Sequence, residues 1–162
     1  MKKDKFLHIE QLVHLEADKF RIVPTNVFEK VIPSFINAVI AFGLATPALI
    51  IFGPGLVWKI LVIVIFGLYE SFVFLFFKDR CLGMKIMDTY WASKYSFKQH
   101  LVYNIFYTLS FATFLIYIWF PLDLLLFNLL AIQLPSVLME GTTLHGYLGG
   151  MRTVKIVMKG AD

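Results

Sequence analysis

Four long hydrophobic runs dominate the chain, and each has the length of a membrane-crossing helix. They cover residues 31–52, 56–77, 101–120 and 122–139. About 20 apolar residues cross roughly 30 Å of hydrocarbon as a helix. The fourth run has only 18 residues, so it either spans with little tilt or lies buried against its neighbours. Gly53-Pro54-Gly55 and Pro121 interrupt the pattern, which predicts two helical hairpins with very short turns.

The overall composition supports an integral membrane protein. The 162 residues are 59% hydrophobic, 17% aromatic and 16% charged, whereas soluble proteins average about 45–50% apolar and about 25% charged residues. So much apolar surface excludes a disordered chain. Cys81 is the single cysteine, which excludes a disulfide scaffold. We therefore expect an all-α membrane protein with one domain, a four-transmembrane-helix bundle.

The basic residues predict the orientation. They lie in the N-terminal arm, in the polar stretch 78–100 and in the C-terminal tail, and only Lys59 lies near the other two turns. The positive-inside rule places the basic segments in the cytoplasm, which requires an even number of spans. We expect a multi-pass protein of the plasma (inner) membrane with cytoplasmic N- and C-termini. The first helix would serve as its own insertion signal, without a cleaved signal peptide.

The polar segments divide the chain into an N-terminal arm (1–30), a transmembrane domain (31–156) and a tail (157–162). In the arm, Phe6, Ile9 and Val13 fall on one helical face. This predicts either an amphipathic helix at the membrane surface or an extension that docks on the protein's own cytoplasmic face. His8 and His14 are six residues apart, poor spacing for a shared metal ion, so we interpret them as surface residues.

Two polar segments resemble each other. Gly83-Met84-Lys85-Ile86 follows the second hydrophobic run, and Gly150-Met151-Arg152-Thr153 follows the fourth. Glycine permits a sharp turn, methionine can enter the acyl region, and the base stays at the headgroups. We expect cytoplasmic interfacial segments that cap the second and fourth helices. The similarity is short enough to arise by chance; otherwise it marks two repeated units.

The same segments resemble the RDD family of small bacterial membrane proteins. That family has an Arg at the start of its first helix, an Asp about seven residues later, a T-x-G-K type segment after the second helix and a T-L-H-D-x-x-x-G-T type motif near its end. The resemblance covers about residues 30–156. The positions that match these motifs are Gly83, Lys85, Thr143, Leu144, His145 and Gly150.

The three charges that define the family are replaced here by Lys30, Asn37 and Gly146. The resemblance implies a shared scaffold. Some family members are linked to cation/proton exchange and others to the regulation of membrane partners. A proton exchanger needs a titratable carboxylate in its pathway, and the amide of Asn37 cannot carry a proton.

Glu70 is an acidic residue inside a predicted span. A charge at that depth costs about 2.5–3.5 kcal/mol on insertion scales, so we expect it to face the bundle interior. One interpretation is a proton- or cation-binding carboxylate partnered by Lys30 or Asn37. The other is a structural carboxylate that pairs with Lys78 or Arg80.

Amide side chains occur at several depths in the predicted spans. Asn37, Asn104, Asn128 and Gln133 either make hydrogen bonds between helices or line a path for a solute. His145 has no second His or Cys at metal-ligand spacing, so we predict a local hydrogen-bonding role.

The sequence carries no signature of an enzyme. H-E-x-x-H, G-x-S-x-G and Walker motifs are missing, so we expect no catalytic, cofactor-binding or metal site. Membrane topology explains the basic residues, so nucleic acid is not implied. We expect a non-enzymatic scaffold, accessory or regulatory subunit in the lipid bilayer, associating with itself or another membrane protein.

The alternative function is a transporter or channel for a small solute, or for cations and protons. It requires Glu70 and Asn37 to face each other at a hydrated cavity. In a scaffold, Glu70 should instead pair with a basic residue of a loop.

Overall fold

The computed structural model describes residues 20–77 and 80–158 and is mostly helical (70%). The predicted arm helix, including His8 and His14, and Lys78 as a partner for Glu70 lie outside the described residues. The elements in chain order are β1 (Phe20–Pro24), α2 (Val27–Phe52), α3 (Leu56–Phe72), the π-helical turn η1 (Val73–Phe77), α4 (Leu82–Ile86), β2 (Thr89–Trp91), α5 (Phe97–Leu115), α6 (Asp123–Phe127), the π-helical segment η2 (Asn128–Gln133), α7 (Leu134–Glu140), α8 (Leu144–Gly149) and β3 (Thr153–Met158).

The first predicted hairpin is present. Helix α2 begins at a capping box in which Asn26 accepts the backbone N–H of Glu29 and Glu29 accepts the N–H of Asn26. It therefore starts four residues before the hydrophobic run and ends at Gly53, whose φ of 68° favours glycine. The second run forms α3 and η1. Val27–Phe52 and Leu56–Phe76 are both long and apolar enough to cross a membrane.

The third hydrophobic run forms α5, whose boundaries differ from the prediction of 101–120. A second capping box, between Ser96 and Gln99, starts the helix at Phe97. The helix ends at Leu115, because Ile116 is extended and the Asp123 carboxylate accepts the N–H groups of Ile118 and Trp119. Three described helices qualify as membrane spans by length and hydropathy, and α5 is not among them. Polar residues in the first two turns of α5 lower its hydropathy.

The fourth hydrophobic run forms a continuous helical segment, Asp123–Glu140, long and apolar enough to span. Its centre, η2, is a π-helix, and the N–H of Leu134 donates to the carbonyl of Leu129. Pro135 follows directly and has no N–H to offer the preceding turn. The wider turn of η2 adapts the backbone to this proline, so the helix continues through Pro135.

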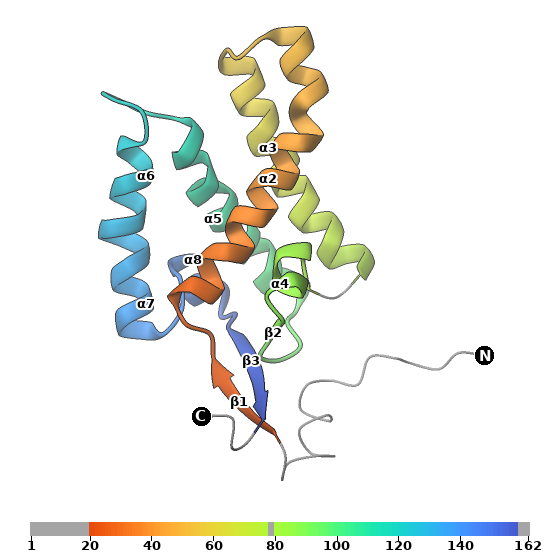
Figure 1. Ribbon diagram of the computed structural model, residues 1–162, viewed down its shortest axis with the longest axis vertical. Coiled ribbons are helices and arrows are strands. Elements are labelled where there is room, and N and C mark those ends of the chain that lie inside the picture. The colour runs from red at the N-terminus through yellow and green to blue at the C-terminus, as the bar shows by residue number, and fades with distance from the viewer. Residues whose placement is uncertain (1–19, 78–79, 159–162) are drawn as a thin grey trace, which may run out of the picture.

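Seven buried side chains form the hydrophobic core where α2, α3 and α5 meet: Ala41, Ala45, Val62, Phe66, Tyr107, Phe111 and Leu115. The rings of Phe66 and Phe111 stack at 4.1 Å between centroids. Segment α6–α7 packs against α5 and α8 but makes at most marginal contact with α2. The predicted four-helix bundle is therefore open between α2 and α6–α7 (Figure 1).

A three-stranded antiparallel sheet, which the sequence analysis did not predict, lies at one end of the helices. Its strand order is β1-β3-β2, with Ile22 opposite Ile156 and Tyr90 opposite Val154. Figure 1 shows this sheet with α4 and α8 at one end, called the sheet end below, and the two interhelical turns at the other, the turn end. The sheet ties together three segments that are distant in sequence.

The chain consists of two similar units. In each, a strand and a capping box precede a long helix, a second helical segment, a short helix and the next strand. Asn37 and Tyr107 each lie eleven residues after their N-cap, and both are buried. The two Gly-Met-base segments are not equivalent in structure. Residues 83–86 lie inside α4, whereas 150–153 leave α8 and enter β3.

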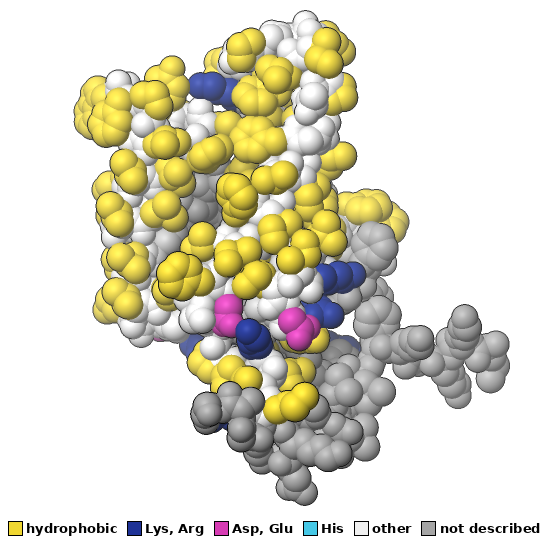
Figure 2. All heavy atoms as spheres, viewed as in Figure 1, with side chains coloured by type: hydrophobic (Ala, Val, Ile, Leu, Met, Phe, Trp, Pro, Cys, Tyr) yellow, Lys and Arg dark blue, Asp and Glu magenta, His cyan; other side chains and the backbone are white. Residues whose placement is uncertain are grey.

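Hydrophobic side chains cover the outside of the helices. Only 17%, 17% and 11% of the most apolar stretches of α2, of Leu56–Phe76 and of Asp123–Glu140 are buried within the chain. Figure 2 shows these side chains over the upper part of the molecule, while most charged side chains gather toward the sheet end. Such an apolar exterior suits contact with lipid.

Candidate functional site: a polar cavity between the two units

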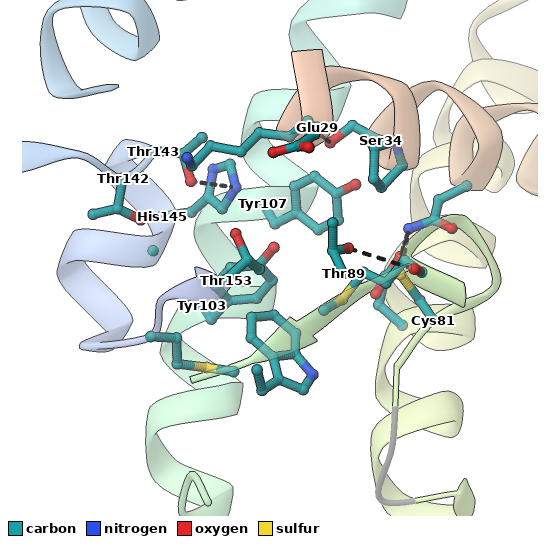
Figure 3. Close-up of a pocket in the computed structure, with 18 residues that line it drawn as sticks. Glu29, Ser34, Cys81, Thr89, Tyr103, Tyr107, Thr142, Thr143, His145 and Thr153 are labelled. Carbon is teal, nitrogen blue, oxygen red and sulfur yellow. Dashed lines mark hydrogen bonds between the residues drawn. The ribbon is translucent and has the colours of Figure 1, made fainter. Parts of the chain in front are cut away.

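A cavity of about 40 Å³ lies between the two units near the sheet end (Figure 3). It is lined by α2, α3, α4 and β2 on one side and by α5, the α7–α8 connection, α8 and β3 on the other. Its polar lining consists of Glu29, Lys30, Ser34, Asn37, Glu70, Thr89, Tyr103, Tyr107, Thr142, Thr143, His145 and Thr153. Polar groups of both units thus converge on one small space.

Asn37 connects three elements at one side of this cavity. Its Nδ2 donates to Glu70 Oε1 at 2.7 Å and to Cys81 Sγ at 3.1 Å. Its Oδ1 accepts the backbone N–H of Gly83 at 3.2 Å. One buried amide therefore joins α2 to α3 and α4, and its hydrogen bonds hold the side chain in a single orientation.

Glu70 is 5% exposed, and Asn37 supplies the side-chain donor to its carboxylate. Asn37, one of the two partners considered from the sequence, is in direct contact with it. The alternative partner Arg80 instead forms an ion pair with Asp88 at 3.3 Å and stacks on the ring of Tyr90 at 3.9 Å. An amide is neutral, so the Glu70 carboxylate has no cationic partner at hydrogen-bonding distance among the described side chains.

Helix α4 docks on α2 through Gly83. A Cβ atom at Gly83 would lie 2.4 Å from the carbonyl oxygen of Pro33, far closer than atoms in contact. Glycine is therefore required for this approach of two backbones. Lys85, the next motif residue, lies on the exposed side of α4.

Cys81 is the N-cap residue of α4 and is 7% exposed. Burial raises the pKa of its thiol to about 12, with the Glu70 carboxylate acting in the same direction. The residue therefore stays a thiol near neutral pH, and its reactivity depends on whether α4 remains docked.

His145 lines the other side of the cavity. Its Nε2 lies 2.9 Å from the Thr143 hydroxyl, as the predicted local role requires, and its ring is 4.9 Å and 4.8 Å from those of Tyr103 and Tyr107. Its Nδ1 is buried and finds no hydrogen-bond partner among the described residues. Burial lowers the pKa of His145 to about 3, so the ring is neutral at physiological pH.

Gly146 and Gly150 shape the turn after His145. A Cβ atom on Gly146 would come within 2.4 Å of Thr142 Oγ1 and 2.9 Å of the Met151 carbonyl oxygen. An aspartate side chain at this position would not fit without movement of the backbone. Gly150 ends α8 in the left-handed conformation, with φ of 63°.

Charged residues form the rim of the cavity at the sheet end. Lys30 Nζ donates to the carbonyl of Thr25, so Lys30 does not pair with Glu70. Glu29 forms an ion pair with Lys155 of β3 at 2.9 Å, which raises the pKa of that lysine. The rim thus carries one acidic and two basic residues, and the Glu29–Lys155 pair joins α2 to the sheet.

The other predicted amides lie outside the cavity. Asn104 donates to the Gly67 carbonyl at 2.9 Å and to Ser71 Oγ at 2.6 Å, which links α5 to α3. Asn128 donates to Ser110 Oγ at 2.6 Å, and Gln133 donates to Asn128 Oδ1 and accepts the Leu144 N–H. These groups make contacts between helices and do not line a common path.

Sequence reasoning missed several residues that line the cavity, above all Tyr103, Tyr107, Ser34 and Thr153. Counting from the two capping boxes would have paired Tyr107 with Asn37, because both occupy the eleventh position of their helices. No comparable signal marks Thr153, which reaches the cavity because β3 pairs with two distant strands.

The core closes the cavity toward the turn end. One turn beyond Asn37, Glu70 and Tyr107, the buried residues are Ala41, Phe66 and Phe111, followed by Ala45, Val62 and Leu115. This packed layer is apolar apart from the Tyr107 hydroxyl.

Comparison of the chain with protein-family models, with curated proteins and with solved structures finds no match in any of the three.

Proposed function

We propose that this chain is a four-span protein of the plasma membrane with both termini in the cytoplasm. Support comes from the position of both interhelical turns at the end opposite α4, α8 and the sheet (Figure 1). Helix α5 would be the remaining span, because its 19 residues cover about 28 Å at 1.5 Å per residue. Lys59, the basic residue near the turn end, lies 4.6 Å from the ring of Tyr117, a suitable site at the headgroups.

Within the membrane, the chain acts as a non-enzymatic accessory or regulatory subunit that associates with itself or with another membrane protein. The apolar layer beyond the cavity carries this proposal. A solute that crossed one copy would have to pass Phe66 and Phe111, whose stacked rings fill the space between α2, α3 and α5. An RDD-like scaffold with Asn37 and Gly146 in place of family carboxylates suits this role.

The proposal is tested by isolating the full chain from native membranes in a mild detergent and determining the mass and composition of the particle. We expect a defined homo-oligomer or a stoichiometric complex with another integral membrane protein. A monomer that by itself moves ions in liposomes, at a rate abolished by Glu70→Gln, would overturn it.

Transport is the second candidate function, because Glu70 meets Asn37 at the cavity as that function requires. Arg80, the described loop base expected to pair with Glu70 in a scaffold, pairs with Asp88. It predicts a flux of protons or small cations through liposomes containing only this chain. The matched control is Glu140→Gln, which neutralises an exposed acidic residue at the end of α7. Equal loss of flux in both variants would show that the flux does not depend on the cavity.

A further inference from the structure

The cavity between the two units has the size and chemistry of a water site. Each buried water needs about 10–15 Å³ of such space and two to four polar partners, so a volume of about 40 Å³ accommodates roughly three waters. His145 Nδ1 is buried and has no hydrogen-bond partner within residues 20–77 and 80–158. Such an atom is expected to bind water, since an unpaired buried polar group costs about 1–3 kcal/mol.

The polar groups that a chain of waters would join lie on opposite sides of the space. Figure 3 shows His145 on one side and Cys81 on the other, with Tyr107, Thr89 and Thr153 between them. Asn37 joins the Cys81 side to Glu70. A row of waters from His145 would therefore pass hydroxyl groups and end near the Glu70 carboxylate.

Access to this space is one-sided. The layer of Ala41, Phe66 and Phe111 seals it from the turn end, whereas at the sheet end it is bounded by Thr153 and by the Glu29–Lys155 pair. Ion pairs at such a rim exchange readily with water. Protons therefore reach the cavity from the sheet side and not through this packed layer.

We propose that the cavity holds a short chain of waters between His145 and Glu70, and that Glu70 is a proton-binding site that equilibrates with the cytoplasmic side alone. This inference rests on the proposed topology and deepens the regulatory role. On release, the Glu70 carboxylic acid gives its proton to the nearest water. The excess proton moves along the chain and leaves at the rim, and a carboxylate remains.

Asn37 couples the protonation state of Glu70 to the docking of α4. An ionised carboxylate in this site attracts both water and the Asn37 Nδ2 group, which also donates to Cys81. The Oδ1 of the same amide accepts a hydrogen bond from the N–H of Gly83. Stronger attraction to Glu70 weakens these two contacts and loosens α4. The other titratable groups that line the cavity or lie against Glu70 are Glu29, Lys30, Tyr69, Cys81, His100, Tyr103, Tyr107 and His145.

Cys81 supplies a direct readout, because it is the only cysteine of the chain and is buried while α4 is docked. The full chain is labelled with N-ethylmaleimide in membrane vesicles of either orientation, with the pH varied separately on each face. The wild-type rate is divided by that of Glu70→Gln at each pH. The Glu70 carboxylate raises the pKa of the Cys81 thiol, so its ionisation alone would lower this ratio, and a rise in the ratio reports the loosening of α4. We expect this ratio to rise by about fivefold between pH 5 and 9 on the cytoplasmic face, the lower end of typical couplings between sites.

A ratio that stays constant, or that follows the pH of the opposite face, would overturn the proposal. Hydroxyl-radical footprinting of the wild-type chain tests the water chain without a variant. Met84 and Met151 line the cavity and are 5% and 1% exposed, so they are oxidised readily only if water is bound beside them. Their full protection, with the exposed Met158 of β3 as positive control, would exclude the waters.

Replacing His145 with Phe should reduce the oxidation of Met151, whereas the same change at His100, buried but outside the cavity lining, should not. Equal effects would assign no role to His145. None of these measurements depends on a partner protein. A failure here is therefore distinguishable from a failure to isolate a complex.

Discussion

Replacing Gly83 with Ala tests whether the approach of α4 to α2 is as close as the structure shows. The new Cβ atom would lie 2.4 Å from the Pro33 carbonyl oxygen and 2.7 Å from its Cα. Both atoms belong to the backbone of α2, so no side chain can rotate away. To reach ordinary contact at about 3.4 Å, α4 must move by about 1 Å.

A movement of this size also breaks the hydrogen bond from Gly83 N–H to Asn37, now 3.2 Å long. Overpacking typically costs about 1–3 kcal/mol, and a lost hydrogen bond about 1 kcal/mol. We therefore expect Gly83→Ala to lower the free energy of unfolding by about 3 kcal/mol, or the melting temperature in detergent by about 6–12 °C. Cys81 should also react faster with maleimide, because α4 shields its thiol.

The matched control is Gly43→Ala, since a Cβ atom at Gly43 meets nothing within 4 Å. Alanine is also the better helix former, by about 1 kcal/mol at most, so this variant should melt at or slightly above the wild-type temperature. If Gly83→Ala and Gly43→Ala melt together and Cys81 stays protected in both, the docking of α4 described above is refuted.

Three further predictions concern the cavity and the turn. Asn37→Leu leaves Glu70 and the Gly83 N–H without their partner, so it should destabilise the fold by about 2–4 kcal/mol; thermal melting would contradict this if Asn37→Leu matched the wild type. The pKa of His145 is lowered from 6.5 in the unfolded chain to about 3 in the fold, so protons bind the unfolded state preferentially between these values. Stability should therefore fall on acidification from about pH 6.5 toward pH 3, by up to about 1.4 kcal/mol per pH unit, and His145→Gln should flatten that part of a melting-temperature profile; identical profiles would exclude the effect. Asp123→Ala removes the acceptor for the N–H groups of Ile118 and Trp119, so limited proteolysis between residues 116 and 122 should accelerate, whereas Glu140→Gln should leave this cleavage rate unchanged.

The sequence alone determined where the long helices lie. Runs of about 20 apolar residues have few alternatives to a helix in lipid, because every backbone polar group must find a partner within the segment. The α2–α3 turn at Gly53 and the fourth segment, Asp123–Glu140, lie within one residue of the predicted boundaries. For α5, hydropathy alone predicted the boundaries Leu101 and Phe120. The helix instead begins at Phe97 and ends at Leu115, because capping groups set its ends.

Among the candidate site residues, the sequence identified Glu70 and Asn37 by a single property. Polar side chains in apolar runs are expected to face the protein interior, because placing them in lipid costs free energy of desolvation. That reasoning applies equally to Asn104, which binds Ser71, and to Asn128 and Gln133, which bind each other and Ser110. The structure places all three outside the cavity. Polarity shows that a residue faces the interior, but not which neighbour it meets there.

Only the tertiary structure decided that the cavity exists and what closes it. Thr153 and Thr89 line one cavity with Glu70 and Asn37 because β3 pairs with both β1 and β2, which lie far from it in the sequence. Strands of three to six residues have little periodicity of their own, and their pairing depends on where the helices bring their ends. The chain's hydropathy indicates which segments are long and apolar enough to span a membrane, whereas the meeting of distant polar groups depends on packing that no local pattern encodes.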